Sequence, residues 1–243
     1  MNITKNITDS LNYPIKDWVK IIILGIIMII PIVNFIGLGY YLRIIKSTLT
    51  GLNELPSFES AGELFIDGIK IFIICLIYAI IPLIFYVLSV SFAGFGTVSS
   101  SITTSSIFSS YLPGLTGISL VFLIIAVISA LIISIFAYVG IVNVANHDSK
   151  IGAALRYREI LDRIAAIGWG KYILWWIVLM LIIIVAGSII GIVGGILLYF
   201  VWGFLVFLLG YGYLTIFQAR SVALIFASRE NTEMLIKNQK LAS

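Results

Sequence analysis

Long apolar stretches separated by short charged segments make up this chain of 243 residues. Residues 21–42, 71–147 and 172–219 contain no Asp, Glu, Lys or Arg. A charge at the centre of a membrane costs at least about 2.5 kcal/mol, so uncharged runs of 77 and 48 residues are typical of segments that lie in lipid. The runs lack the two-residue alternation of a membrane β-barrel. The pattern therefore predicts an all-α fold, a polytopic helical bundle in a membrane.

The lengths of the apolar stretches predict four full spans, because one spanning helix needs about 20 residues. A polar loop, Thr97–Ser110, divides the second stretch, and ten of its 14 residues are Ser or Thr. A glycine-rich turn, Gly191–Gly195, divides the third stretch. A spacing of four residues also relates Gly187, Gly191 and Gly195, and this spacing is equally typical of a close helix-packing face. We treat residues 1–243 as one transmembrane domain, with spans at 67–92, 115–142, 172–191 and 196–220.

The first apolar stretch has two interpretations. Residues 21–45 are long enough for one tilted span, but they also fit a re-entrant hairpin broken at Pro31–Asn34, because Pro31 removes a helical hydrogen bond. We favour the hairpin, since it leaves the N-terminal lysines on the same side as the other charges. It also gives the same direction to two similar sequences that precede apolar stretches, Trp18-x-Lys20 and Trp169-x-Lys171. Asn34 is expected to supply hydrogen bonds to the backbone of the buried hinge.

Basic residues predict the orientation of the chain. The three later polar segments lie on one side if each apolar block between them holds two spans, and they contain 12 of the 15 Lys and Arg residues. The positive-inside rule places these charged loops and the C-terminus in the cytoplasm, for a chain that crosses the plasma membrane several times. Amphipathic segments near 57–68 and 149–168 are expected to lie in the headgroup region, the first starting at a capping box, Ser60–Glu63.

Motifs for catalysis or cofactor binding are absent from the sequence. It has no Gly-rich phosphate loop, no metal-spaced Cys or His pairs and no nucleophile elbow, and it contains a single histidine, His147, and a single cysteine, Cys75. We therefore expect no cofactor, no metal and no enzymatic activity; an enzyme acting on lipid would lack a nucleophile. The net charge of +4 favours contact with membrane lipids and does not indicate nucleic-acid binding.

Two functions from different classes remain. The first is a non-catalytic scaffold or partner subunit, which binds another membrane protein or a second copy of itself. The second is a small permease or channel with a site near the broken first segment, because several transporters build their sites from discontinuous helices. The candidate lining or hinge positions of such a site are Pro31, Asn34, Pro82, Asn143 and Gln218. We favour the alternative that these polar groups serve helix packing.

Several motifs of the chain resemble one family. They are Tyr13-Pro14-x-x-Asp17-Trp18-x-Lys20, Pro31-x-x-Asn34-Phe35, Gly39-Tyr40-x-x-Arg43, Glu54-Leu55-Pro56, Gly168-Trp169-Gly170-Lys171 and Phe217-x-Ala219-Arg220. Together they resemble the DUF4013 family of polytopic membrane proteins, which is abundant in archaea, over nearly the whole chain. The chain departs from the family pattern in having no proline at Gly194-Gly195. The resemblance implies a polytopic membrane architecture and implies no activity.

Overall fold

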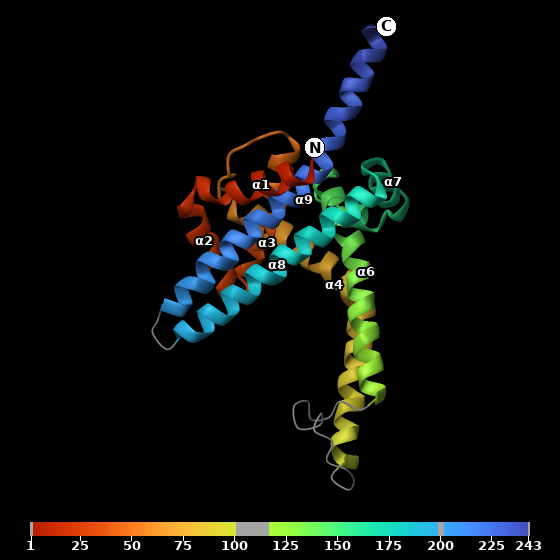
Figure 1. Ribbon diagram of the computed structural model, residues 1–243. Helices are drawn as coiled ribbons and strands as arrows, with labels where there is room; N and C mark the ends of the chain where they lie inside the picture. Colours follow the sequence, from red (N-terminus) through yellow and green to blue (C-terminus); the bar gives the residue numbers. More distant parts are fainter. Residues whose placement is uncertain (1, 101–116, 199–201, 243) are drawn as a thin grey trace. The chain divides into compact units, whose positions relative to one another are not determined.

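Helices form most of the part of the protein whose structure is described. The computed structural model describes residues 2–100, 117–198 and 202–242, and no strand occurs among them. The elements are α1 (Ile3–Asn12), η1 (Pro14–Lys16), α2 (Trp18–Ile29), α3 (Asn34–Leu49), α4 (Ala61–Ser100), α6 (Gly117–Asn146), η2 (Ile151–Leu155), α7 (Tyr157–Ile167), α8 (Trp169–Leu197) and α9 (Trp202–Ala242), where η marks a 3-10 helix (Figure 1). The predicted all-α membrane architecture is confirmed.

Four of the helices are long and apolar enough to cross a membrane, as predicted. They are Ala61–Ala93, Gly117–Asn146, Trp169–Leu197 and Trp202–Ala227. The predicted turn at Gly191–Gly195 is wrong, because α8 continues through these glycines. In lipid the backbone finds its hydrogen-bond partners only within the helix, and glycine is therefore a weaker helix breaker there than in water. The glycines do not pack against another helix of the described chain either, since a side chain at Gly187, Gly191 or Gly195 would enter open space.

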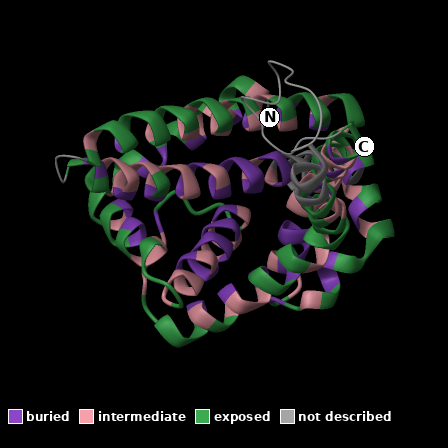
Figure 2. Ribbon diagram, turned by 90° about the horizontal axis from the view of Figure 1, so that it is seen from below, coloured by how far each residue is buried: buried purple, intermediate pink, exposed green. Residues whose placement is uncertain are grey.

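The chain forms two compact units, residues 1–74 with 138–243, and residues 75–137. In the larger unit α9 is the central helix, against which α1, α2, α3 and α8 pack. Its spanning segment is less apolar than the other three, with a mean hydropathy of 1.4 against 2.9 to 3.1, and it is also more buried. Figure 2 shows the buried and exposed positions along the helices. Because a larger part of α9 faces protein, it can carry polar side chains on its buried face.

The first apolar stretch is broken, as the hairpin interpretation predicted. Helix α2 ends at Ile29 and α3 begins at Asn34, and Ile32 between them has a φ of 71°, in the left-handed region. The backbone N–H of Asn34 donates to the carbonyl of Ile30 at 3.0 Å, which closes the turn. Both limbs pack against α9 and against each other. The alternative of one continuous helix over residues 21–45 is thereby excluded.

Glycines let both limbs of the hairpin lie close to their neighbours. At four positions in the two crossings that involve these limbs, a Cβ atom would overlap a backbone carbonyl oxygen of the opposite helix. These positions are Gly25 and Gly212 where α2 crosses α9, and Gly39 and Gly68 where α3 crosses the first turns of α4. Each crossing therefore depends on a pair of glycines, one from each helix, because no side chain fits between the two backbones.

The predicted amphipathic segments have different outcomes. Residues 149–168 form η2 and α7, which are separate from α8. The segment near 57–68 forms no helix of its own, because α4 starts at Ala61 and continues directly into the spanning region; the carbonyl of Ser60 accepts hydrogen bonds from the N–H groups of Glu63 and Leu64. Of the predicted Ser/Thr loop, residues 97–100 belong to α4, and the rest lies outside the described residues.

Candidate functional site

The most prominent polar feature of the larger unit is Arg220 on α9. Among the described residues it is the only charged residue that is buried, with 2% of its surface exposed. A buried cation is stable only when its donors are satisfied. The guanidinium donates to Asp9 Oδ1 at 3.2 Å, Thr48 Oγ1 at 3.2 Å, the carbonyl of Leu52 at 3.0 Å and Asn53 Oδ1 at 2.6 Å, and it lies 4.4 Å from the centre of the Tyr13 ring. Arginine suits this position because its planar guanidinium directs several donors at once.

Residues 52–59, which we call the strap, connect α3 to α4 beside Arg220. The strap is not helical, so its carbonyl groups lack partners in secondary structure. Seven of them accept hydrogen bonds from side chains instead. The pairs are Leu52 with Arg220, Asn53 with Lys16, Glu54 with Tyr13, Leu55 with Lys20, Pro56 with Tyr40, and both Ser57 and Glu59 with Arg43. Four cationic side chains and two tyrosine hydroxyls thus supply the hydrogen bonds that a neighbouring strand supplies in a sheet.

The N-terminal helix α1 is fixed to the same site. Asn6 is completely buried, and its Nδ2 donates to the carbonyl of Ser221 on α9 at 3.1 Å. Ser221 Oγ in turn donates to Asn6 Oδ1 at 2.8 Å and accepts from Trp175 Nε1 on α8 at 3.0 Å. These three side chains join α1, α8 and α9 next to Arg220.

A second polar cluster contains a serine and a lysine, the two residue types of one class of hydrolase. Lys46 Nζ donates to Ser149 Oγ at 2.6 Å and to Asp67 Oδ2 at 3.1 Å, and Ser149 Oγ donates to Asp67 at 3.0 Å. The Asp67 carboxylate accepts hydrogen bonds from both side chains and so ties the lysine and the serine to a third element. The cluster is therefore suited to joining α3, α4 and the connection between α6 and η2. The described residues contain no group of three or more His, Cys, Asp and Glu that could hold a metal ion.

Glu159 on α7 is the centre of a third cluster. Its carboxylate lies 3.5 Å from His147 Nε2, 3.6 Å from Arg156 Nη1 and 3.3 Å from Arg163 Nη2. Burial raises the pKa of Glu159, but hydrogen bonds from Asn143 and Arg163 and the charges of His147 and Arg163 outweigh it and hold the pKa below its usual range. These interactions fix α7 to the end of α6.

Because the pKa of Glu159 is lowered in the folded protein, its ion pairs stabilise the protein above the pKa of an unfolded glutamate, about 4.3, and this contribution is lost as pH falls through the folded pKa. Glu159→Gln should therefore melt below the wild type at pH 7, and the difference should shrink as the pH falls below about 4. Melting curves in detergent across this pH range test the expectation. Asp162→Asn is the matched control, since Asp162 lies exposed on the same helix. A gap for Glu159→Gln that does not change with pH would contradict it.

The five residues predicted to line a site come from different elements of the chain. Pro31 is exposed at the hinge, and Pro82 lies inside α4, in the other unit. Asn143 is buried, and its Nδ2 donates to the carbonyl of Ala153 at 2.9 Å. Gln218 Nε2 donates to Tyr138 Oη at 2.7 Å. Asn34 makes no side-chain hydrogen bond with the described residues, and its Oδ1 is buried without a partner. Asn143 and Gln218 therefore form hydrogen bonds with neighbouring elements of the described structure.

Asn34 does not supply hydrogen bonds to the hinge in the way that the sequence suggested, because backbone groups close the turn. Asn34→Leu should leave the melting temperature unchanged or raise it, since leucine removes a buried acceptor whose lack of a partner costs roughly 1–3 kcal/mol. A thermal-shift assay in detergent measures this. Gln218→Leu serves as the comparison and should lower the melting temperature, because it breaks the bond to Tyr138. A clear loss of stability in Asn34→Leu would refute this account of the hinge.

Sequence reasoning overlooked Arg220, Asn6 and Asp9 as site residues. Each lies in a charged segment outside the apolar stretches, where a polar side chain normally faces water or headgroups. One signal was available, because Tyr13, Lys20, Tyr40, Arg43 and Arg220 all belong to the motifs that carry the family resemblance. The structure shows that each of these five side chains donates to the strap.

The comparison with known families agrees with this architecture. A family model described as "Protein of unknown function (DUF4013)" matches residues 23–198. The chain belongs to the DUF4013 family. The matched range contains the hinge, the strap and α7, while Arg220 lies outside it. No curated protein and no solved structure matches the chain.

Proposed function

We propose that this DUF4013 protein is a non-catalytic membrane module, a scaffold or partner subunit. The observation that carries the proposal is that its most polar site is buried and bonded within the protein. Arg220 uses four of its five N–H donors in hydrogen bonds within the protein and is 2% exposed, so it offers almost no surface to a substrate. The apolar helices are in contrast widely exposed, with only 6% of the spanning window of α6 buried. Such surfaces are suited to contact with lipids and with other membrane helices.

We further propose that the strap, α1 and α7 face the cytoplasm from a plasma-membrane protein, and that the α2–α3 hairpin re-enters the membrane from that side. Within the larger unit α1 and α7 lie near one end of the α8–α9 pair, and the last turn of α8 and the first turn of α9 lie at the other (Figure 1). The excess of Lys and Arg in the polar segments supports the cytoplasmic side. The packing of both hairpin limbs against α9 supports re-entry, since re-entrant backbone is tolerated only where protein surrounds it.

Purification of the full chain in mild detergent tests the scaffold proposal. The mass of the complex, measured by light scattering, should exceed that of one 26.8 kDa chain by a stoichiometric partner or a second copy. The same preparation in proteoliposomes should not increase the flux of ions or small solutes above that of empty vesicles. A monomer without a partner that mediates solute flux would overturn the proposal.

One observation favours a small permease as the second candidate. Asn34 Oδ1 is a buried acceptor without a partner, and it lies where α3 begins after a break, as polar groups of transporter sites do. Functional sites often retain polar groups that cost stability. If Asn34 binds a solute, Asn34→Leu should abolish flux in proteoliposomes without lowering the melting temperature.

A further inference from the structure

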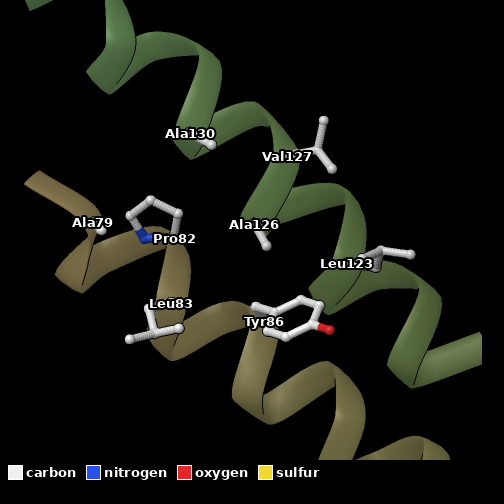
Figure 3. Close-up of a pocket in the computed structure, with 8 residues that line it drawn as sticks. All are labelled: Ala79, Pro82, Leu83, Tyr86, Leu123, Ala126, Val127 and Ala130. Atoms are coloured by element: carbon white, nitrogen blue, oxygen red, sulfur yellow. The ribbon is translucent and has the colours of Figure 1, made fainter. Parts of the chain in front are cut away.

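The smaller unit, residues 75–137, contains an apolar groove between α4 and α6. The groove has a volume of about 490 Å³, within the range of about 300–1,000 Å³ that is usual for small-molecule sites. Both helices belong to the spanning set, and no residue between 71 and 147 is charged. Residues that line it include Ala79, Pro82, Tyr86, Leu123, Ala126 and Ala130 (Figure 3).

The groove exists because small side chains line both helices where larger ones would fill the space. Ala126 and Ala130 of α6 lie opposite Pro82 and Ala79 of α4 (Figure 3). Elsewhere along the pair, Phe122 stacks between two phenylalanines of α4, with ring centroids 6.5 Å from Phe85 and 5.4 Å from Phe92. These rings hold the helices apart.

A buried hydrogen bond fixes the register of the same two helices. Ser89 Oγ donates to the carbonyl of Ser119 at 2.8 Å, and both residues are buried. The alanines cannot slide away from their positions while this bond and the stacked rings hold. The groove is therefore a lasting feature of the helix pair.

Hydrocarbon is the natural content of such a groove. A helix pair that crosses a membrane has no water beside it at this depth. An apolar wall without neighbouring atoms loses its dispersion contacts, so the space is filled by chains from the surrounding lipid. This argument identifies the main body of the ligand as apolar.

Tyr86 adds one polar requirement. Its side chain lies along the groove with the hydroxyl toward α6 (Figure 3), and the residue is 52% exposed. No described residue accepts a hydrogen bond from this hydroxyl. A hydroxyl without an acceptor in an apolar environment costs about 1–3 kcal/mol. A ligand that carries an oxygen acceptor at this end of the groove removes that cost.

The depth of Tyr86 indicates which oxygen this is. Ile71 is the first residue of the uncharged stretch, and 15 residues of helix from there to Tyr86 span about 22 Å. The hydrocarbon core is about 30 Å thick, so a helix that enters it at Ile71 along the membrane normal brings Tyr86 to about 8 Å from the far boundary. The oxygens that join lipid chains to the headgroup lie at this boundary. Ala79 lies about 10 Å closer to the centre of the membrane than Tyr86, which is the direction in which a lipid chain extends from its headgroup.

We propose that the groove binds one hydrocarbon chain of a bilayer lipid, and that the Tyr86 hydroxyl donates a hydrogen bond to the oxygen that links this chain to the headgroup. The chain runs from Tyr86 and Leu123 toward Ala79 and Ala130. None of its lining residues belongs to the polar cluster around Arg220, so this proposal does not depend on the scaffold function.

Native mass spectrometry of the full chain tests the proposal. The protein is released from nanodiscs of a diacyl phosphatidylcholine or its dialkyl ether analogue, and the retained lipid is counted. Wild type should retain one lipid per chain. Tyr86→Phe should lower the ratio of lipid-bound to lipid-free protein roughly fivefold for at least one lipid, the factor expected for one ordinary hydrogen bond, and the lipid affected shows whether an ester or an ether oxygen accepts. Ala126→Leu should abolish retention in both.

Two controls separate the groove from other exposed positions. Tyr211→Phe removes the hydroxyl of an exposed tyrosine on α9, and Gly187→Leu adds bulk where a side chain meets open space on α8. Both should retain lipid as the wild type does. Unchanged retention in Tyr86→Phe with both lipids, or in Ala126→Leu, overturns the proposal. So does a wild-type dimer that Ala126→Leu dissociates, because a second copy would then fill the groove.

Discussion

Arg220→Met should destabilise the protein by about 3 kcal/mol or more. Methionine has nearly the same length but no donor, so Asn53, Thr48 and the carbonyl of Leu52 lose their partner, and Asp9 is left without its counter-charge. The side chain of Asp9 is 37% exposed, and water can therefore solvate part of its charge, which places the expected loss at the lower end for a broken buried pair. Thermal unfolding in detergent measures the loss.

Two further variants make the Arg220 experiment specific. Arg158→Met removes an exposed arginine that has no ion-pair partner in the described structure, and it should change the stability by less than about 0.5 kcal/mol. Arg220→Lys should fall between the wild type and Arg220→Met, because one ammonium cannot reach all four acceptors. Equal melting temperatures for wild type and Arg220→Met would show that the cluster does not hold the fold together.

Gly68→Ala is the second large effect that we expect. An added Cβ would overlap the carbonyl oxygen of Phe35, so α3 and α4 must separate where they cross. Overpacking of this kind costs typically about 1–3 kcal/mol, and a clash with backbone is harder to relieve than one with a side chain. The melting temperature should fall accordingly.

Gly62 provides the matched control on the same helix. A Cβ at this position meets nothing within 4 Å, and alanine is a better helix former than glycine by up to about 1 kcal/mol. Gly62→Ala should therefore leave the stability unchanged or raise it. If Gly62→Ala and Gly68→Ala behave alike, propensity and not close packing governs this helix, and the crossing is looser than described.

The membrane architecture could be predicted from the sequence because its determinants are local. Lipid excludes charge, so the uncharged stretches locate four spans without knowledge of any contact. Pro31 removes a backbone donor wherever it lies, and the helix does break there. The turn at Gly191–Gly195 was predicted wrongly, since α8 continues through these residues. Glycine is common both in turns and within membrane helices, so its presence alone does not distinguish the two.

Only the tertiary structure decided where the polar residues meet. Arg220 and Asp9 are 211 positions apart, and Asn53 comes from a loop between two other helices. In the sequence each is an ordinary polar residue of a charged segment, because the apolar pattern predicts which segments lie in lipid and not which residues lie side by side. Of the residues predicted from the sequence, Asn143 donates to Ala153, ten positions away, whereas Gln218 donates to Tyr138, 80 positions away on α6. A hydrogen bond needs two groups within about 3 Å, and folding alone sets that distance.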